Sequence, residues 1–168
     1  MAATAGTDWT LIPGNHQDIE QVRENCRRMV RRRAAISAGV SAIPLPGIDV
    51  MSDLSLFALL VEDVNKAFGL TPAQVERLQP KFRLIAYEAA VGMGGMMVGK
   101  LITRELVLQL FRRSGIKIMA KTAARIVPLA GQVVAAAIGF GVFRQLGYQH
   151  VEACAAVARE LIVARPIN

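Results

Sequence analysis

The sequence predicts an all-α protein, a compact bundle of about six or seven helices with two proline-glycine corners. Three observations predict this fold class. Apolar side chains recur at helical spacing along most of the chain, proline and glycine interrupt this pattern at helix-length intervals, and no stretch shows the alternation of a half-buried strand. The expected organisation is a flexible N-terminal tail over residues 1–17 and a single helical domain over residues 18–165.

The first helix is expected to begin at Asn15 or Asp18, because either side chain can cap a helix, and to run through an arginine-rich stretch to about Ser41. Pro44 and Pro46 then end the helix, because proline lacks a backbone N–H and excludes the preceding residue from helical space. The expected apolar stripe of this helix consists of Val22, Cys26, Met29, Ile36 and Val40.

A second helix is expected over residues 48–68, and Gly69 is its expected terminator. A short third helix follows directly. In this helix Thr71 is the cap, Pro72 occupies the first helical position and Gln74 completes a capping box.

The second half of the chain continues as helices with glycine interruptions. Residues 81–113 are expected to be helical, but the stretch GMGGMMVG at residues 92–99 predicts a break, a kink or a close helix crossing. An amphipathic helix is expected over residues 116–126, and an apolar helix then ends before Gly147. A last amphipathic helix is expected over residues 148–163. Its inward side is expected to hold Val151, Ala155, Ala158 and Ile162.

The composition is more apolar than a small globular protein needs. Hydrophobic residues make up 53% of the 168 residues and the mean hydropathy is +0.37, which favours a fully buried bundle, an oligomer or contact with lipid. The net charge is +7, and the basic residues are clustered. Such clusters can bind the phosphates of lipids or nucleic acid. The simpler interpretation is that they form a solvated helix face. The residues expected to bind anionic lipid or a partner are Arg23, Arg27, Arg28, Arg31, Arg32, Arg33, Lys117, Lys121 and Arg125.

Two short apolar corners separate the predicted helices. The corner residues are Ile43, Pro44, Leu45, Pro46 and Gly47, and then Val127, Pro128, Leu129 and Gly131. Their prolines remove backbone donors, so the corners are expected either in the core or inserted in a membrane interface. The corners are 84 residues apart, which fits a weak internal duplication or two uses of one turn. For the charge-free residues 126–143, spanning a membrane, shallow insertion and burial in the core all stay open.

No enzyme, cofactor or metal site is expected. Residues 94–100 have the spacing of a phosphate-binding loop, but Leu101 occupies the position of the Ser or Thr that would hold magnesium. Asp49 and Asp53 lie one turn apart near a helix start, where carboxylates stabilise the helix without any chemistry.

The histidines and cysteines do not form a recognisable site either. His150 is expected to stand alone beside a helix start, and Cys26 and Cys154 show no base partner, metal spacing or disulfide framework. The cysteine usage indicates a reducing compartment, and residues 1–15 do not resemble a secretory signal. The expected location is cytoplasmic, either peripheral to the inner face of the membrane or partly inserted in it.

Several pieces of the chain, in order, carry a family resemblance. They are the arginine-rich helix, AIPLPGIDVMSDLSLFALLVEDVNKAFGL, VPLAGQVVAAAIGFGVF and the closing amphipathic helix. Together they resemble the helical domain of the immunity-related (interferon-inducible) GTPases and the related bacterial YcjF-like domain that follows some Era-like GTPase domains. In those GTPases a nucleotide-binding domain comes first, and no such domain is expected here. The resemblance therefore implies a stand-alone helical module with roles in membrane attachment and self-assembly.

The expected function is a non-catalytic helical module that associates with the cytoplasmic membrane face and mediates self-assembly or docking of a partner. A separate GTPase is one candidate partner. The alternative is a soluble homo-oligomeric scaffold or interaction subunit whose apolar surface is buried in a complex. Nucleic acid ranks below an anionic membrane surface, because only 5% of the residues are aromatic and none lies among the arginines.

Overall fold

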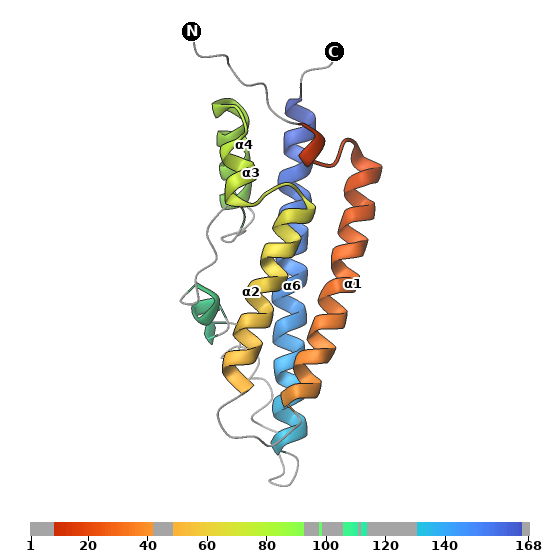
Figure 1. Ribbon diagram of the computed structural model, residues 1–168, viewed down its shortest axis with the longest axis vertical. Helices are drawn as coiled ribbons and strands as arrows, with labels where there is room; N and C mark the ends of the chain where they lie inside the picture. Colours follow the sequence, from red (N-terminus) through yellow and green to blue (C-terminus); the bar gives the residue numbers. More distant parts are fainter. Residues whose placement is uncertain are drawn as a thin grey trace. The chain divides into compact units, whose positions relative to one another are not determined.

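The computed structural model describes residues 9–41, 49–92, 98, 106–110, 112–113 and 131–165. These residues contain helices and no strand, which confirms the all-α prediction. The elements with both ends among them are the 3-10 turn η1 (Trp9–Leu11) and the helices α1 (His16–Ser41), α2 (Asp49–Ala67), α3 (Pro72–Glu76), α4 (Pro80–Gly92) and α6 (Gly131–Ala164) (Figure 1). These are five α-helices, and the predicted total of six or seven extends into residues outside the described ones. The two predicted corners also lie outside them, apart from Gly131, which is the first residue of α6.

The chain divides into two compact units. Unit 1 comprises Met1–Arg27, Val61–Leu101 and Gln149–Asn168, and unit 2 comprises Arg28–Leu60 and Ile102–Tyr148. Helices α1, α2 and α6 each place one part in unit 1 and the other part in unit 2, whereas α3 and α4 belong to unit 1. Each unit is therefore built from segments that are far apart in the sequence.

Helix α1 has the predicted ends. Asn15 Oδ1 accepts a hydrogen bond from the backbone N–H of Asp18 at 2.9 Å, so Asn15 rather than Asp18 is the cap. The helix ends at Ser41, in agreement with the prediction. The start of the helix thus follows from a hydrogen bond that spans three residues of the chain.

The buried side of α1 differs from the predicted stripe. Ile36, a member of the predicted apolar stripe, is 50% exposed. Each helical residue is rotated by about 100° from the one before, which puts Ile36 about 110° from the centre of the stripe that is buried. The position of a residue around the helix, and not the size of its apolar side chain, therefore decides whether it is buried. The buried residues of α1 are Ile19, Cys26, Val30, Ala34 and Ser37.

The local signals around α2, α3 and α4 are confirmed. Gly69 follows α2 with φ 71°, a left-handed conformation that costs glycine little. Thr71 Oγ1 accepts a hydrogen bond from the Gln74 backbone N–H at 3.3 Å, and Gln74 Oε1 accepts one from the Thr71 backbone N–H at 3.0 Å. This is the predicted capping box. Helix α4 ends at Gly92, the first residue of the glycine-rich stretch, most of which lies outside the described residues.

Helix α6 continues through Gly147, which corrects the predicted helix end there. A Cβ atom at Gly147 would lie 2.7 Å from Val30 Cγ1 on α1 and 3.2 Å from Leu60 Cδ2 on α2, all within unit 2. The glycine thus allows close packing of α6 and does not end the helix. Glycine costs a helix about 1 kcal/mol relative to alanine, and here tertiary packing outweighs that cost. Farther along α6, Val151, Ala155 and Ala158 are buried as predicted, and Ile162 is half-buried.

Each unit contains a pair of aromatic side chains that pack against each other. In unit 2, the rings of Phe57 and Phe143 pack edge to face with their centroids 5.1 Å apart. In unit 1, Trp9 of η1 packs edge to face on Phe82 of α4, with centroids 4.8 Å apart. The guanidinium of Arg165 lies 5.2 Å from the centroid of the Trp9 ring, a cation–π contact. The turn η1 is therefore packed between α4 and the end of α6.

Candidate functional site

The six arginines of α1 do not form one continuous site. Arg23 and Arg27 belong to unit 1, and the remaining four belong to unit 2. The side chains on the unit 1 side are engaged by carboxylates from another helix. On the unit 2 side, Arg28, Arg31 and Arg32 are exposed, and Arg33 is half-buried.

Glu152 on α6 engages both arginines of unit 1. Arg23 Nε donates hydrogen bonds to Oε1 and Oε2 of Glu152 at 2.9 and 2.8 Å, and Arg27 Nη1 donates to Oε1 at 2.7 Å. Burial raises the pKa of the Glu152 carboxyl, but the hydrogen bonds from the two arginines outweigh burial and lower that pKa overall. Arg23 and Arg27, which are predicted to bind lipid or a partner, belong to a partly exposed ion-pair cluster within the chain. The cluster extends through Glu20, which pairs with Arg23 and with Arg159.

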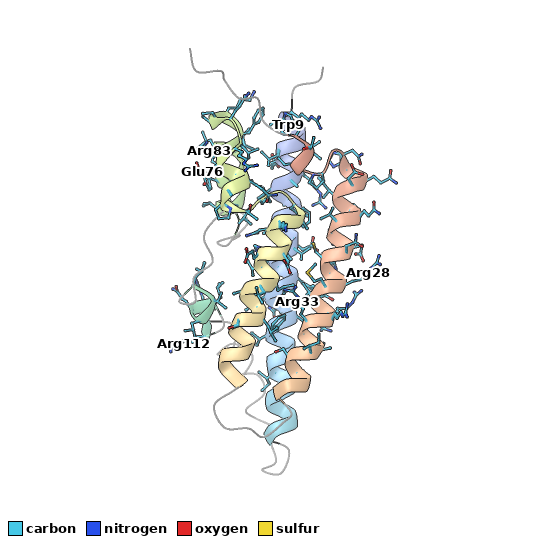
Figure 2. The ribbon with its side chains drawn as sticks, in the orientation of Figure 1. Trp9, Arg28, Arg33, Glu76, Arg83 and Arg112 are labelled. Carbon is cyan, nitrogen blue, oxygen red and sulfur yellow. The ribbon has the colours of Figure 1, made fainter. Side chains whose placement is uncertain are left out.

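Three arginines of unit 2 form the basic face of α1, defined as Arg28, Arg31 and Arg32. All three are exposed, and their spacing of three and four residues places them on one side of the helix. No Asp or Glu among the described residues lies within ion-pair distance of any of them. Figure 2 shows the Arg28 side chain directed outward from α1. These three charges are available to an external anion.

The other predicted basic residues do not join this face within the described part of the chain. The Arg33 side chain is half-buried overall, but its Nη1 atom is fully buried. Lys117, Lys121 and Arg125 lie outside the described residues, as do all of the predicted corner residues except Gly131. Of the nine predicted basic site residues, the structure places three, Arg28, Arg31 and Arg32, together on an exposed side of α1.

The charge of the chain is divided unequally between the units. The sequence within the ranges of unit 2 holds eleven Lys and Arg against three Asp and Glu, a net charge of +8. The ranges of unit 1 hold nine Lys and Arg against ten Asp and Glu, a net charge of −1. The net positive charge of the protein therefore lies in unit 2, and the basic face of α1 belongs to this unit.

An apolar side chain continues the basic face. Ile36 follows Arg32 by four residues and Arg28 by eight, so the three side chains lie along one stripe of α1. Half of the Ile36 side chain is accessible to solvent. A stripe that carries guanidinium groups and an exposed apolar group is suited to the boundary between headgroups and acyl chains of a membrane.

Sequence reasoning missed a buried polar cluster in unit 1, formed by Asn65, His150 and Cys154. His150 Nε2 lies 2.9 Å from Asn65 Oδ1 and 3.5 Å from Cys154 Sγ. Cys154 Sγ donates a hydrogen bond to Asn65 Oδ1 at 3.4 Å. Part of this cluster could have been predicted from the sequence. His150 and Cys154 are four residues apart, and that spacing places two side chains next to each other on one helix.

This cluster has the residue types of a cysteine hydrolase but not its chemistry. Burial lowers the pKa of His150 to about 4 and raises the pKa of Cys154 well above its ordinary value, so the imidazole and the thiol are both neutral. A nucleophilic cysteine needs the opposite shift, toward a thiolate. The thiol and the amide also approach the same ring nitrogen, whereas a relay through the ring needs both nitrogens. The cluster is a satisfied polar group within the core of unit 1.

The described residues also lack two other kinds of feature. No group of three or more His, Cys, Asp or Glu side chains among them is arranged to hold a metal ion. None of the helices within residues 9–41, 49–92 and 131–165 combines the length and the hydropathy that crossing a bilayer requires. Comparisons with protein families, with curated proteins and with solved structures find no match for this chain.

Proposed function

We propose that this protein is a non-catalytic helical module that binds the anionic surface of a membrane, at its cytoplasmic face, through the basic face of α1. One observation carries the proposal. Arg28, Arg31 and Arg32 project from the unit that holds all of the net positive charge, and no carboxylate among the described residues neutralises them. A surface of this kind is attracted to phosphate-bearing headgroups over roughly a Debye length.

The expected strength of binding fits a reversible, peripheral association. Each arginine near an anionic leaflet contributes about 1 kcal/mol before screening by salt, so three contribute about 3 kcal/mol. Insertion of the exposed Ile36 adds an apolar contribution. The exposed Arg112 and Arg113 belong to the same unit and would strengthen the long-range attraction. The two proline-glycine corners predicted from the sequence complete the proposal as further apolar elements, in a fold of six or seven helices.

Lipid is favoured over nucleic acid by the residues around the arginines. Nucleic-acid grooves and single strands are recognised by polar side chains that read base edges and by aromatic side chains that stack on bases. The exposed neighbour of Arg32 on this stripe is Ile36, which offers neither interaction. The resemblance to the helical domain of immunity-related GTPases and YcjF-like proteins supports the same choice, and it adds self-assembly or docking of a separate GTPase as the proposed role at the membrane.

Co-flotation with lipid vesicles tests the proposal. We compare the wild-type protein with the variant R28E/R32E and with a matched control, K66E/R77E, which changes two exposed cations of unit 1 and alters the net charge equally. We expect binding to vesicles that contain anionic lipid, loss of binding in 0.5 M salt (about a 4 Å screening length) and no binding to neutral vesicles. R28E/R32E should weaken binding by about tenfold or more, and the control by less than about twofold.

Two outcomes would contradict the proposal. Equal losses in R28E/R32E and in the control would show that net charge alone drives binding, without a specific face. An absence of binding to anionic vesicles would favour the alternative function, a soluble homo-oligomeric scaffold. One observation supports that alternative, since Leu84 and Val91 on α4 are large apolar side chains that remain mostly exposed.

A further inference from the structure

Helix α4 carries a solvent-facing stripe that the basic face of α1 does not explain. Lys81, Leu84, Glu88 and Val91 are spaced by three, four and three residues, so they share one side of the helix. Leu84 is 58% exposed and Val91 is 76% exposed. The opposite side of α4 is buried in unit 1 through Phe82, Ala86 and Ala90.

The two charged residues of this stripe have no ion-pair partner among the described residues. The carboxylate of Glu76 pairs with Arg83 and not with Lys81; its Oε2 lies 2.8 Å from Arg83 Nη1 (Figure 2). Its Oε1 lies 3.4 Å from the Tyr87 hydroxyl. The Lys81 ammonium lies 5.1 Å from the centroid of the Phe82 ring, a weak cation–π contact. Within the described part of the chain, neither Lys81 nor Glu88 forms an ion pair with a charge of opposite sign. The stripe therefore offers two unpaired charges of opposite sign around an exposed leucine.

The order of these residues is self-complementary under a two-fold rotation. Lys81 and Glu88 lie at equal distances on either side of the midpoint between residues 84 and 85. A two-fold axis through that midpoint, perpendicular to the helix, turns α4 end for end. This rotation creates two equivalent pairs, in each of which Lys81 of one copy lies opposite Glu88 of the other. It also brings the two Leu84 side chains together at the axis. A parallel arrangement would instead oppose each charge with its own copy.

We propose that α4 is a self-association surface, whose occupant is the antiparallel α4 of a second copy of this chain. A single helix of 13 residues offers a smaller contact than the interfaces of stable dimers. The dimer is therefore weak and concentration-dependent, and its formation is favoured where the protein is concentrated on a surface. This inference goes beyond the proposed membrane binding and uses different residues, all in unit 1.

A second register of the same helices is disfavoured by charge. An axis between residues 87 and 88 would oppose Leu84 with Val91 of the other copy twice, and so would bury more apolar surface. It would also bring Glu88 close to its own copy, and like charges in contact are unfavourable. The two registers predict different outcomes for charge reversal, which makes the arrangement testable.

Sedimentation equilibrium of the full chain at low salt, over a wide range of concentration, tests the proposal. We compare the wild type with K81E, E88K, the double reversal K81E/E88K and L84S. A matched control is E160K, which reverses an exposed charge elsewhere in unit 1. Circular dichroism of each variant establishes that it is folded, which is expected because all the changed positions are exposed.

The proposal expects a wild-type dimer that K81E and E88K each weaken by about tenfold or more, because each places like charges opposite one another. The double reversal should restore the affinity to within about threefold of wild type, L84S should weaken it, and E160K should leave it unchanged. A wild-type monomer at all concentrations would overturn the proposal. Single variants that the double reversal does not rescue would overturn the Lys81–Glu88 arrangement. Vesicle flotation of K81E reports separately on the basic face, so the two proposals can fail independently.

Discussion

His150 and Asn65 meet inside unit 1, where Nε2 of the imidazole lies 2.9 Å from Oδ1 of the amide and both side chains are buried. The contact joins α6 to α2 through two polar groups in an otherwise apolar core. A buried polar group that loses its partner costs about 1–3 kcal/mol, so the contact penalises any shift of one helix along the other within this unit. It also makes the stability of the protein depend on pH.

Lowering the pH from 7 to 5 should destabilise the protein. Burial lowers the pKa of His150 from 6.5 to about 4, because the imidazolium is poorly solvated in the core. Between these two pKa values the unfolded chain binds a proton that the folded chain does not. The stabilisation is therefore complete above pH 6.5 and falls as the pH decreases toward 4, by about 2 kcal/mol at pH 5. Urea denaturation at a series of pH values measures the change.

Substitution of each histidine provides the control for this pH dependence. H150Q should reduce stability at pH 7, because the polar cluster is disturbed, and should flatten the dependence between pH 7 and 5. H16Q changes the exposed histidine at the start of α1 and should keep the wild-type dependence. The pKa values of the Glu20 and Glu152 carboxyls are lowered in the folded protein, so these two groups affect stability mainly at pH values below this range. A wild-type pH dependence in H150Q would show that His150 is not its source.

Both cysteine thiols should be unreactive in the folded protein. Cys26 and Cys154 are buried, and burial raises the pKa of Cys26 to about 11 and that of Cys154 in the same direction. The thiolate is the reactive form, so both burial and pKa disfavour attack. An aromatic disulfide reagent at pH 8 should label neither thiol in native buffer and both in denaturant. Rapid labelling in native buffer would contradict the described packing of unit 1.

Removing the carboxylate of Glu152 should destabilise the protein by about 1 kcal/mol, because two half-buried guanidinium groups lose their shared acceptor. E152Q is the variant, and the free energy of unfolding is the measurement. E24Q is the matched control on α1, since Glu24 is exposed and its Oε1 lies 3.9 Å from Arg27 Nε. We expect less than about 0.5 kcal/mol for E24Q. Equal losses of unfolding free energy in E152Q and E24Q would show that Glu152 contributes no more to stability than an exposed carboxylate.

Alanine at Gly147 should destabilise the protein by about 1–3 kcal/mol, although alanine is the better helix former. The added Cβ would lie 2.7 Å from Val30 Cγ1. Gly139 on the same helix is the control, because a Cβ there meets no atom within 4 Å, and G139A should stabilise by up to about 1 kcal/mol. Thermal or urea unfolding measures both. G147A should cost less in a V30A background, and a G147A variant as stable as wild type would argue against the close packing.

Much of the local structure follows from the sequence alone. The cap at Asn15, the left-handed Gly69 and the capping box of Thr71 and Gln74 are all confirmed. Each of them rests on backbone conformation or on hydrogen bonds that span three residues or so. Such interactions do not depend on where the rest of the chain lies, and the residue types that make them are few.

The sequence by itself determined that the chain is helical, where several helices begin and end, and that its arginines are concentrated in one stretch of α1. The tertiary structure decided which arginines are engaged, because Glu152 is 129 residues from Arg23 in the sequence. It also decided that α6 continues through Gly147 and that His150 has partners. At Gly147 the contact between distant segments outweighs a local preference of about 1 kcal/mol. In all three cases the deciding contact joins segments that are far apart in the sequence, whereas the sequence pattern records only local preferences.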